Sequence, residues 1–198
     1  MKLLTNIAND KNNLLMVSVS LVIIFIFALS ASAQQSKNIR EVDFKNFTYS
    51  LSCGNFDSPE PVTVKNGEYQ GPKREEQVHL VISEIKFADL NGDGKEEAII
   101  QYKCESGKNY EYAAGMIFTI KNNKSIFLTN INGGDKSNGY LTEIRVVKNL
   151  LLVKTLQTGY SKDNSAPESV KYIKTAKFRL QGKRLIQVGK ANWRENNE

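Results

Sequence analysis

Oxygen-bearing side chains recur at regular positions of one short segment, which reads Asp89-Leu-Asn91-Gly-Asp93-Gly-Lys95-Glu-Glu97. With Asp89 as position 1, side-chain oxygens fall at positions 1, 3, 5 and 9, and Lys95 at position 7 offers its backbone carbonyl. Calcium takes roughly six to eight hard oxygen ligands, and this spacing lets one tight loop supply most of them. The two glycines permit the positive-φ turns that point these oxygens inward. The residues therefore predict a calcium site formed by Asp89, Asn91, Asp93, Lys95 and Glu97.

The same segment also has an interpretation that needs no metal. Asn-Gly and Asp-Gly are favoured dipeptides of tight hairpin turns, so the residues also fit a plain turn between two strands. Position 12 is Ile100 rather than the glutamate of an EF-hand, and the flanking residues have the pattern of strands, which excludes an EF-hand. Three carboxylates in one turn repel each other unless a cation lies among them, and this favours the metal.

The segment resembles the calcium loop of FG-GAP/VCBS-type modules, in which Asp-x-Asn-x-Asp-Gly-x-x-Asp/Glu joins two strands. The resemblance implies ligand roles for Asp89, Asn91, Asp93 and Glu97, and it covers about 16 of the 198 residues. The Phe-Gly and Gly-Ala-Pro elements of that family are absent and the unit is not repeated, so no propeller is implied. The resemblance extends to small secreted or periplasmic bacterial proteins that carry one such hairpin.

The rest of the chain assembles no set of catalytic groups. His79 is the only histidine, so it would have to serve as the base in any Ser-His-Asp arrangement. The acidic pairs 75–76 and 96–97 are adjacent residues, which point to opposite faces of a strand and cannot act together on one glycosidic bond. We therefore expect a non-catalytic domain with a binding or structural role. The alternatives are an extracytoplasmic hydrolase with dispersed acidic residues and a periplasmic inhibitor or adaptor of another protein.

The N-terminal segment has the pattern of a secretory signal. Residues 14–29 are almost purely apolar, follow Lys2 and Lys11, and lead into a run of small residues that ends at Ala33. This pattern predicts cleavage after Ala33 and an extracytoplasmic protein, periplasmic or secreted, that begins at Gln34. An uncleaved membrane anchor is the alternative, because the apolar run approaches the ~20 residues that span a bilayer. The N-terminal segment would bind a membrane only if it stays uncleaved.

Cys53 and Cys104 are the two cysteines of the chain, and export would place them in an oxidising compartment. Cys53 ends an alternating run that starts at Phe47, and Cys104 ends another that starts at Ala98. The alternation puts each thiol on the buried side of its strand. The pattern predicts a structural Cys53–Cys104 disulfide, with two unpaired core thiols or a redox-active cysteine as alternatives.

From Gln34 onward the sequence predicts a single mainly β domain, residues 34–198, after a signal peptide or anchor at 1–33. Runs rich in Val, Ile, Phe, Tyr and Thr alternate with short turn-like segments, which is typical of an antiparallel sheet or a small sandwich built of hairpins, with one short helix as an option. The expected strands are 40–53, 62–65, 78–89, 97–105, 111–121, 125–131, 141–148, 150–157, 168–181 and 184–194. Long loops are expected at 55–76, 132–139 and 158–167.

Positive charge is concentrated at the C-terminal end. Residues 169–198 carry eight basic and two acidic side chains, whereas residues 34–168 carry 17 basic and 18 acidic ones. Alternation places Lys171, Lys177 and Arg179 on one face of a strand, opposite its apolar side chains. Such a stripe is typical of a solvated sheet face, and it also predicts attachment to an anionic surface such as lipid headgroups or an acidic envelope polymer. An unknown protein or an anionic envelope surface is thus the expected partner, and the export signal argues against nucleic acid.

Overall fold

A computed structural model describes residues 38–51, 59–71, 78–107, 110–136, 138–158 and 171–196. The chain divides after Gln35 into two units, and the features below belong to the second, Ser36–Glu198. The predicted signal segment and its cleavage site at Ala33 lie outside the described residues. Within the described ranges no helix is both long enough and apolar enough to cross a bilayer.

The described chain is mainly β, as the sequence predicted. Its one short helix is the 3₁₀ turn η1 (Ile39–Glu41). The strands are β1 (Thr48–Leu51), β2 (Glu60–Thr63), β3 (Glu68–Gln70), β4 (Val78–Ala88), β5 (Glu97–Ser106), β6 (Tyr110–Lys121), β7 (Lys124–Asp135), β8 (Asn138–Val147), β9 (Leu150–Thr158), β10 (Lys171–Gln181), β11 (Arg184–Gln187) and β12 (Asn192–Asn196).

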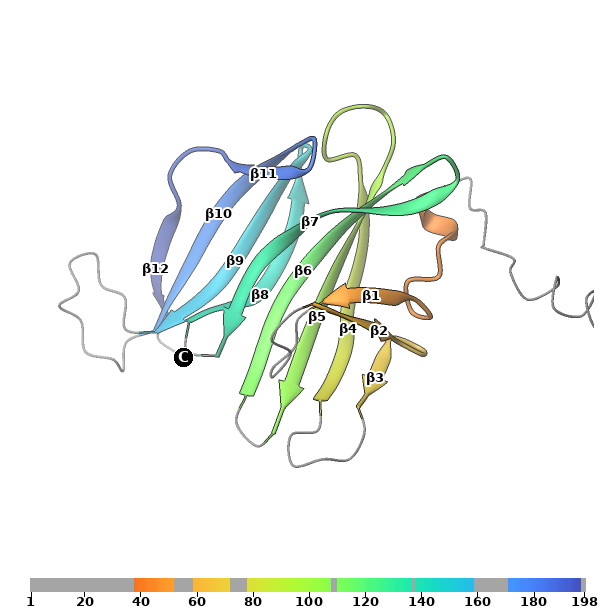
Figure 1. Cartoon of the computed structure of the whole chain (residues 1–198). Coiled ribbons are helices and arrows are strands. Elements are labelled where there is room, and N and C mark those ends of the chain that lie inside the picture. The colour runs from red at the N-terminus through yellow and green to blue at the C-terminus, as the bar shows by residue number, and fades with distance from the viewer. Residues whose placement is uncertain are drawn as a thin grey trace, which may run out of the picture. The chain divides into compact units, whose positions relative to one another are not determined.

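The strands lie side by side almost in chain order (Figure 1). The hydrogen-bonded sequence is β3-β4-β5-β6-β7-β8-β9-β10-β11, with β12 also on β10 and with β1–β2 as a separate hairpin. Neighbours are antiparallel except β7 and β8, which meet through the single parallel pair Asp135–Gly139. We therefore treat the sheet as two half-sheets, β3–β7 and β8–β12, that are joined at this pair.

Each face of half-sheet β3–β7 covers a separate apolar core. The first core includes Tyr49 and Leu51 from β1 together with Ile100 from β5, so the β1–β2 hairpin and η1 cover this face. The second core includes Ile99 from β5 and Val153 from β9, so half-sheet β8–β12 packs on the opposite face. The central strand β5 is thus buried on both sides. Its apolar run at residues 98–100 is the pattern expected of such a strand.

Residues 121–124 and 148–149 are two of the short turn-like segments expected between strands, and both form tight hairpin turns. Asn122, Asn123, Lys148 and Asn149 all have positive φ, between 48° and 60°. Two consecutive residues with positive φ form the type I′ turn, whose twist matches that of paired strands. Asparagine tolerates this conformation better than most residues, which is why these positions were recognisable in the sequence.

Residues 40–47 were wrongly predicted to be strand. Asn38 caps η1 by accepting a hydrogen bond from the Arg40 N–H at 3.0 Å. The Asp43 carboxylate then accepts the N–H groups of Lys45 and Asn46 at 3.1 and 3.2 Å. These short polar side chains satisfy backbone donors locally, so the backbone turns here. Lys45 and Phe47 accept the N–H groups of Gly67 and Val64 without forming a regular strand.

The glycine-rich segment 132–139 was wrongly predicted to be a long loop, because β7 continues to Asp135 and β8 begins at Asn138. Gly133 explains the error. A Cβ atom at this position would lie 1.7 Å from the Ala113 carbonyl oxygen, so glycine here permits β7 to cross close to β6. The predicted strand 184–194 is likewise two strands, β11 and β12, separated by residues 188–191.

Candidate functional site

The Asp/Asn-rich segment forms the connection between β4 and β5, which confirms that it is a hairpin turn. Ala88, the last residue of β4, pairs with Glu97, the first residue of β5, and the intervening residues 89–96 form the loop. Gly92 and Gly94 have φ of 80° and 82°, and a Cβ atom at either position would meet nothing within 4 Å. Glycine is therefore favoured at these two positions by backbone conformation rather than by lack of space.

The polar side chains of the loop fold back onto its own backbone. The Asp89 carboxylate accepts N–H groups from both loop glycines, at 2.6 and 3.0 Å. The Asn91 Oδ1 atom accepts the Asp93 N–H at 2.8 Å, and the Asp93 Oδ1 atom accepts the Lys95 N–H at 2.8 Å. Three of the five predicted ligand residues therefore fix the shape of the loop through main-chain hydrogen bonds.

Glu97 lies at the base of this loop with 0% of its surface exposed. Its Oε2 atom accepts the Leu90 N–H at 2.8 Å, and its Oε1 atom accepts from the Asn91 side-chain amide at 3.0 Å. Burial raises the pKa of the Glu97 carboxyl to about 7; the Leu90 N–H opposes this shift, and the negative charges of Asp93 and Asp89 add to it. A buried carboxylate at this position is costly unless a proton or a cation accompanies it.

The Asn91 amide group lies between two carboxylates. Its Nδ2 atom is 3.0 Å from Glu97 Oε1 and 3.3 Å from Asp93 Oδ2. In this arrangement no three carboxylate, imidazole or thiol groups of the described residues are gathered closely enough to hold a metal. A half-turn of the amide would place Oδ1 instead of Nδ2 between the same two carboxylates, which is an oxygen set of the kind that Ca²⁺ binds, and it would break the hydrogen bond from the Asp93 N–H to Oδ1.

The neighbouring carboxylate, Glu96, points away from Glu97 and has a different partner. The Arg40 guanidinium binds both of its oxygens, at 2.5 and 2.8 Å, and lies 4.8 Å above the centre of the Phe87 ring. This pairing lowers the pKa of Glu96 through the hydrogen bond from Arg40. Residues 96 and 97 therefore have separate partners, although only Glu97 belongs to β5 and Glu96 lies in the loop. The sequence did not reveal the Arg40 contact, because 56 positions separate the two residues.

The other residues singled out in the sequence are spread over the domain. His79 lies on β4 with its Nδ1 atom 3.8 Å from Glu105 Oε2, and it is partly exposed. Cys104 is completely buried in the first core, to which β1 also contributes. Cys53 lies outside the described residues, so the Cys53–Cys104 bridge stays a prediction.

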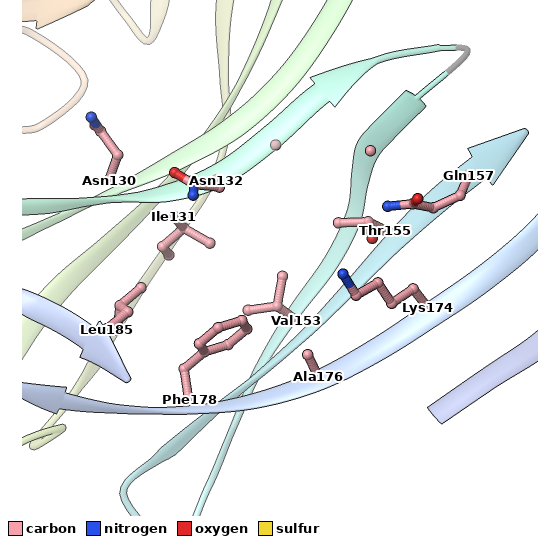
Figure 2. Close-up of a pocket in the computed structure, with 12 residues that line it drawn as sticks. Asn130, Ile131, Asn132, Val153, Thr155, Gln157, Lys174, Ala176, Phe178 and Leu185 are labelled. Atoms are coloured by element: carbon pink, nitrogen blue, oxygen red, sulfur yellow. The ribbon is translucent and has the colours of Figure 1, made fainter. Parts of the chain in front are cut away.

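A cleft of about 260 Å³ opens between β7 and the inner surface of strands β9 to β11 (Figure 2). Its apolar lining consists of Ile131, Val153, Ala176, Phe178 and Leu185. Its polar lining consists of Asn130, Asn132, Thr155, Gln157 and Lys174. No carboxylate lines it, so this cleft offers no acid/base pair for hydrolysis. These residues come from four strands, and no sequence motif brings them together.

The predicted basic stripe is confirmed as a geometric feature. Lys171, Lys177 and Arg179 are exposed on β10, whereas Ala176 and Leu180 of the same strand are buried. Figure 2 shows the opposite side of the strand, where Lys174, Ala176 and Phe178 line the cleft. The described chain thus presents two separate polar features of interest, the 89–97 loop and the charged side of β10.

No protein-family model, curated protein or solved structure matches the chain.

Proposed function

We propose that this chain is an extracytoplasmic, non-catalytic β domain with a binding or structural role, in which Ca²⁺ stabilises the 89–97 loop. The metal would hold the loop in place and would take no part in a reaction. The N-terminal signal pattern supports the compartment, and calcium-binding modules outside cells typically work at about 10⁻⁴–10⁻³ M calcium.

The observation that carries the calcium proposal is the buried carboxylate of Glu97. It lies beside Asp89 and Asp93, whose charges raise its pKa, and its nearest side-chain donor is the uncharged amide of Asn91. An amide offers only a partial positive charge, so the negative charges of the cluster are poorly balanced when all three residues are ionised. A divalent cation would supply the missing positive charge.

Each predicted ligand has a role in the proposed site. Asp89, Asp93 and Glu97 would provide carboxylate oxygens, and Lys95 would provide its backbone carbonyl. The Asn91 amide would rotate by a half-turn and present Oδ1 instead of Nδ2. The main-chain hydrogen bonds of Asp89 and Asp93 would remain, whereas this rotation would break the bond from the Asp93 N–H to Asn91 Oδ1.

Three pockets among the described residues lack a pair of facing carboxylates. The cleft between β7 and strands β9 to β11 has no carboxylate in its lining. A second pocket, lined by Lys95 and Lys121 among others, has one carboxylate, that of Glu96. A third pocket contains three tyrosines, Tyr102, Tyr110 and Tyr112, and no acidic residue. A glycosidase-type hydrolase needs two carboxylates facing one substrate, and none of these three pockets supplies a pair.

Thermal unfolding in calcium and in chelator tests the proposal. A ligand that binds only the folded state stabilises it by about 2.7 kcal/mol at 100 times its Kd, so calcium should raise the Tm measurably. Asp93→Ala should abolish this increase, because it removes a central ligand on an exposed loop without touching either core.

Glu96→Ala is the matched control. It removes the adjacent carboxylate, which Arg40 already binds and which faces away from the loop interior. The Tm of this variant should lie below that of the wild type by a similar amount in calcium and in chelator. Calcium should therefore raise the Tm of the variant as it raises that of the wild type. Equal melting temperatures for the wild type with and without calcium would mean that the segment is only a hairpin turn and does not bind the metal.

A further inference from the structure

Half-sheet β8–β12 has one face that the second core does not use, which we call the outer face. On β9, Leu151 and Val153 point into the second core. The alternate residues of that strand, and those registered with them on β10 and on β8 from Glu143 onward, therefore point outward. Within the described part of the chain, the elements that contact this half-sheet do so across the second core or along strand edges, and none lies over the outer face.

The outer face carries a strong excess of positive charge. The strand register places seven basic residues on it: Arg145, Lys154, Lys171, Lys177, Arg179, Arg184 and Arg194. Glu143 is its one acidic residue among those described, and it forms ion pairs with Arg145 and Lys154. The stripe recognised in the sequence is therefore the middle of a larger basic surface that extends over five strands.

Apolar side chains lie among these charges. Outward-facing positions hold Val147, Leu150, Leu152, Leu156, Ile173 and Ile186. Val147 and Ile186 are 51% and 40% exposed, and the others are partly exposed. A plain solvated sheet face carries polar residues at such positions, and a surface built for a soluble polyanion gains nothing from leucines. A mixture of cations and apolar side chains is typical of a surface that lies in a lipid headgroup region, with its apolar groups toward the acyl chains.

We propose that the outer face of half-sheet β8–β12 docks on an anionic lipid surface. The basic side chains would meet the headgroup phosphates, and the apolar side chains would enter the boundary between headgroups and acyl chains. This surface is separate from the 89–97 loop, so the proposal does not depend on calcium binding.

Brominated anionic lipids provide a test that locates the contact on the protein. Trp193 is the single tryptophan, so a Trp193→Phe background allows a new tryptophan to report from one chosen position. In that background, Ile186→Trp should be quenched by vesicles of brominated phosphatidylglycerol at low salt. Phe127→Trp is the matched control, because Phe127 is 43% exposed but lies on β7. The tryptophan at position 127 should not be quenched, even if the apolar run at 14–29 holds the full chain on the vesicle.

Charge and apolar variants separate the two parts of the proposal. Replacing Lys171, Lys177 and Arg179 with Ser should lower the low-salt affinity for phosphatidylglycerol vesicles roughly a hundredfold. Replacing Lys65, Lys121 and Lys124 with Ser removes the same charge from exposed positions elsewhere and should have little effect. Val147→Thr with Ile186→Thr should weaken binding to vesicles and leave binding to the soluble polyanion heparin unchanged. Circular dichroism and thermal unfolding establish that each variant is folded.

Three results would overturn the proposal. One is the absence of quenching at position 186 with phosphatidylglycerol at low salt. Another is an equal loss of binding in the two triple-serine variants, which would mean that net charge alone is responsible. The third is that the Val147 and Ile186 changes do not alter vesicle binding and that heparin binds with a similar affinity. That result would identify a general polyanion surface.

Discussion

At the scale of single residues, Glu97 has the most unusual environment among the described carboxylates. Its carboxyl is fully buried, and its pKa is raised from 4.5 to about 7, chiefly by that burial. Between pH 4.5 and 7 the folded state retains a proton that the unfolded chain releases. The contribution of this group to stability is therefore fully present below pH 4.5 and is lost as the pH rises through 7.

This titration gives a measurable slope in the metal-free protein. In chelator, the free energy of unfolding should fall by up to about 3 kcal/mol as the pH rises from roughly 5 to 8, because one pKa unit corresponds to about 1.4 kcal/mol. Urea denaturation at a series of pH values measures this fall. Glu97→Gln cannot titrate and should lack this component, so parallel curves for wild type and variant would contradict the prediction. Saturating calcium should also remove the fall, because it favours the ionised carboxylate.

The sequence was sufficient to identify the loop but not the contacts within it. Spacing alone located Asp89, Asn91, Asp93, Lys95 and Glu97 between two strands, and the turn between those strands is confirmed. Nothing in the spacing indicated that Asn91 would turn its amide nitrogen toward Asp93 and Glu97. The orientation of an amide depends on the hydrogen bonds available after folding, and these come from groups whose positions the sequence does not specify.

At the scale of secondary structure, Gly133 determines how closely β7 approaches β6. A Cβ atom there would lie 1.7 Å from the Ala113 carbonyl oxygen and 2.7 Å from its carbonyl carbon, so the backbone of one strand would have to move. Gly133→Ala should destabilise the protein by about 3 kcal/mol, at the upper end of overpacking effects, and disturb the junction with β8. Chemical denaturation measures the loss.

Gly189→Ala serves as the control for that experiment. Gly189 has a φ of 74°, but a Cβ atom at this position would meet nothing within 4 Å. Its replacement should therefore cost about 1 kcal/mol, from backbone conformation alone. A loss at position 133 no larger than that at 189 would mean that β6 and β7 can separate at little cost.

Strands with one polar face were easier to predict in detail than strands with apolar residues on both faces. In β10, alternation correctly separated the basic stripe from the buried residues Ala176 and Leu180. In β9, the run Leu150-Leu-Leu-Val153 gives no alternation, so its sequence does not show which leucines face the second core and which face outward. The register with β8 and β10 supplied that distinction. The extended outer face therefore could not have been recognised from the sequence.

At the scale of the whole molecule, the location of the protein depends on residues before the described domain. The apolar run 14–29 and the small residues that end at Ala33 predict an exported chain that begins at Gln34. Intact-mass measurement of the protein recovered after export should give the mass of residues 34–198. A full-length chain that begins at Met1 and fractionates with membranes would instead indicate an uncleaved anchor.

The order of the strands also has a consequence for how the chain folds. From β3 to β11, each strand pairs with the next strand in the chain, and β12 departs from this order by returning to β10. Most pairings therefore join residues that are close in sequence, which keeps the entropy lost on loop closure small. We expect a lower relative contact order, and hence faster folding, than in sandwiches whose partner strands are distant in sequence. Because one residue pair, Asp135–Gly139, links the two half-sheets, each half-sheet can form from its own hairpins before the second core closes between them.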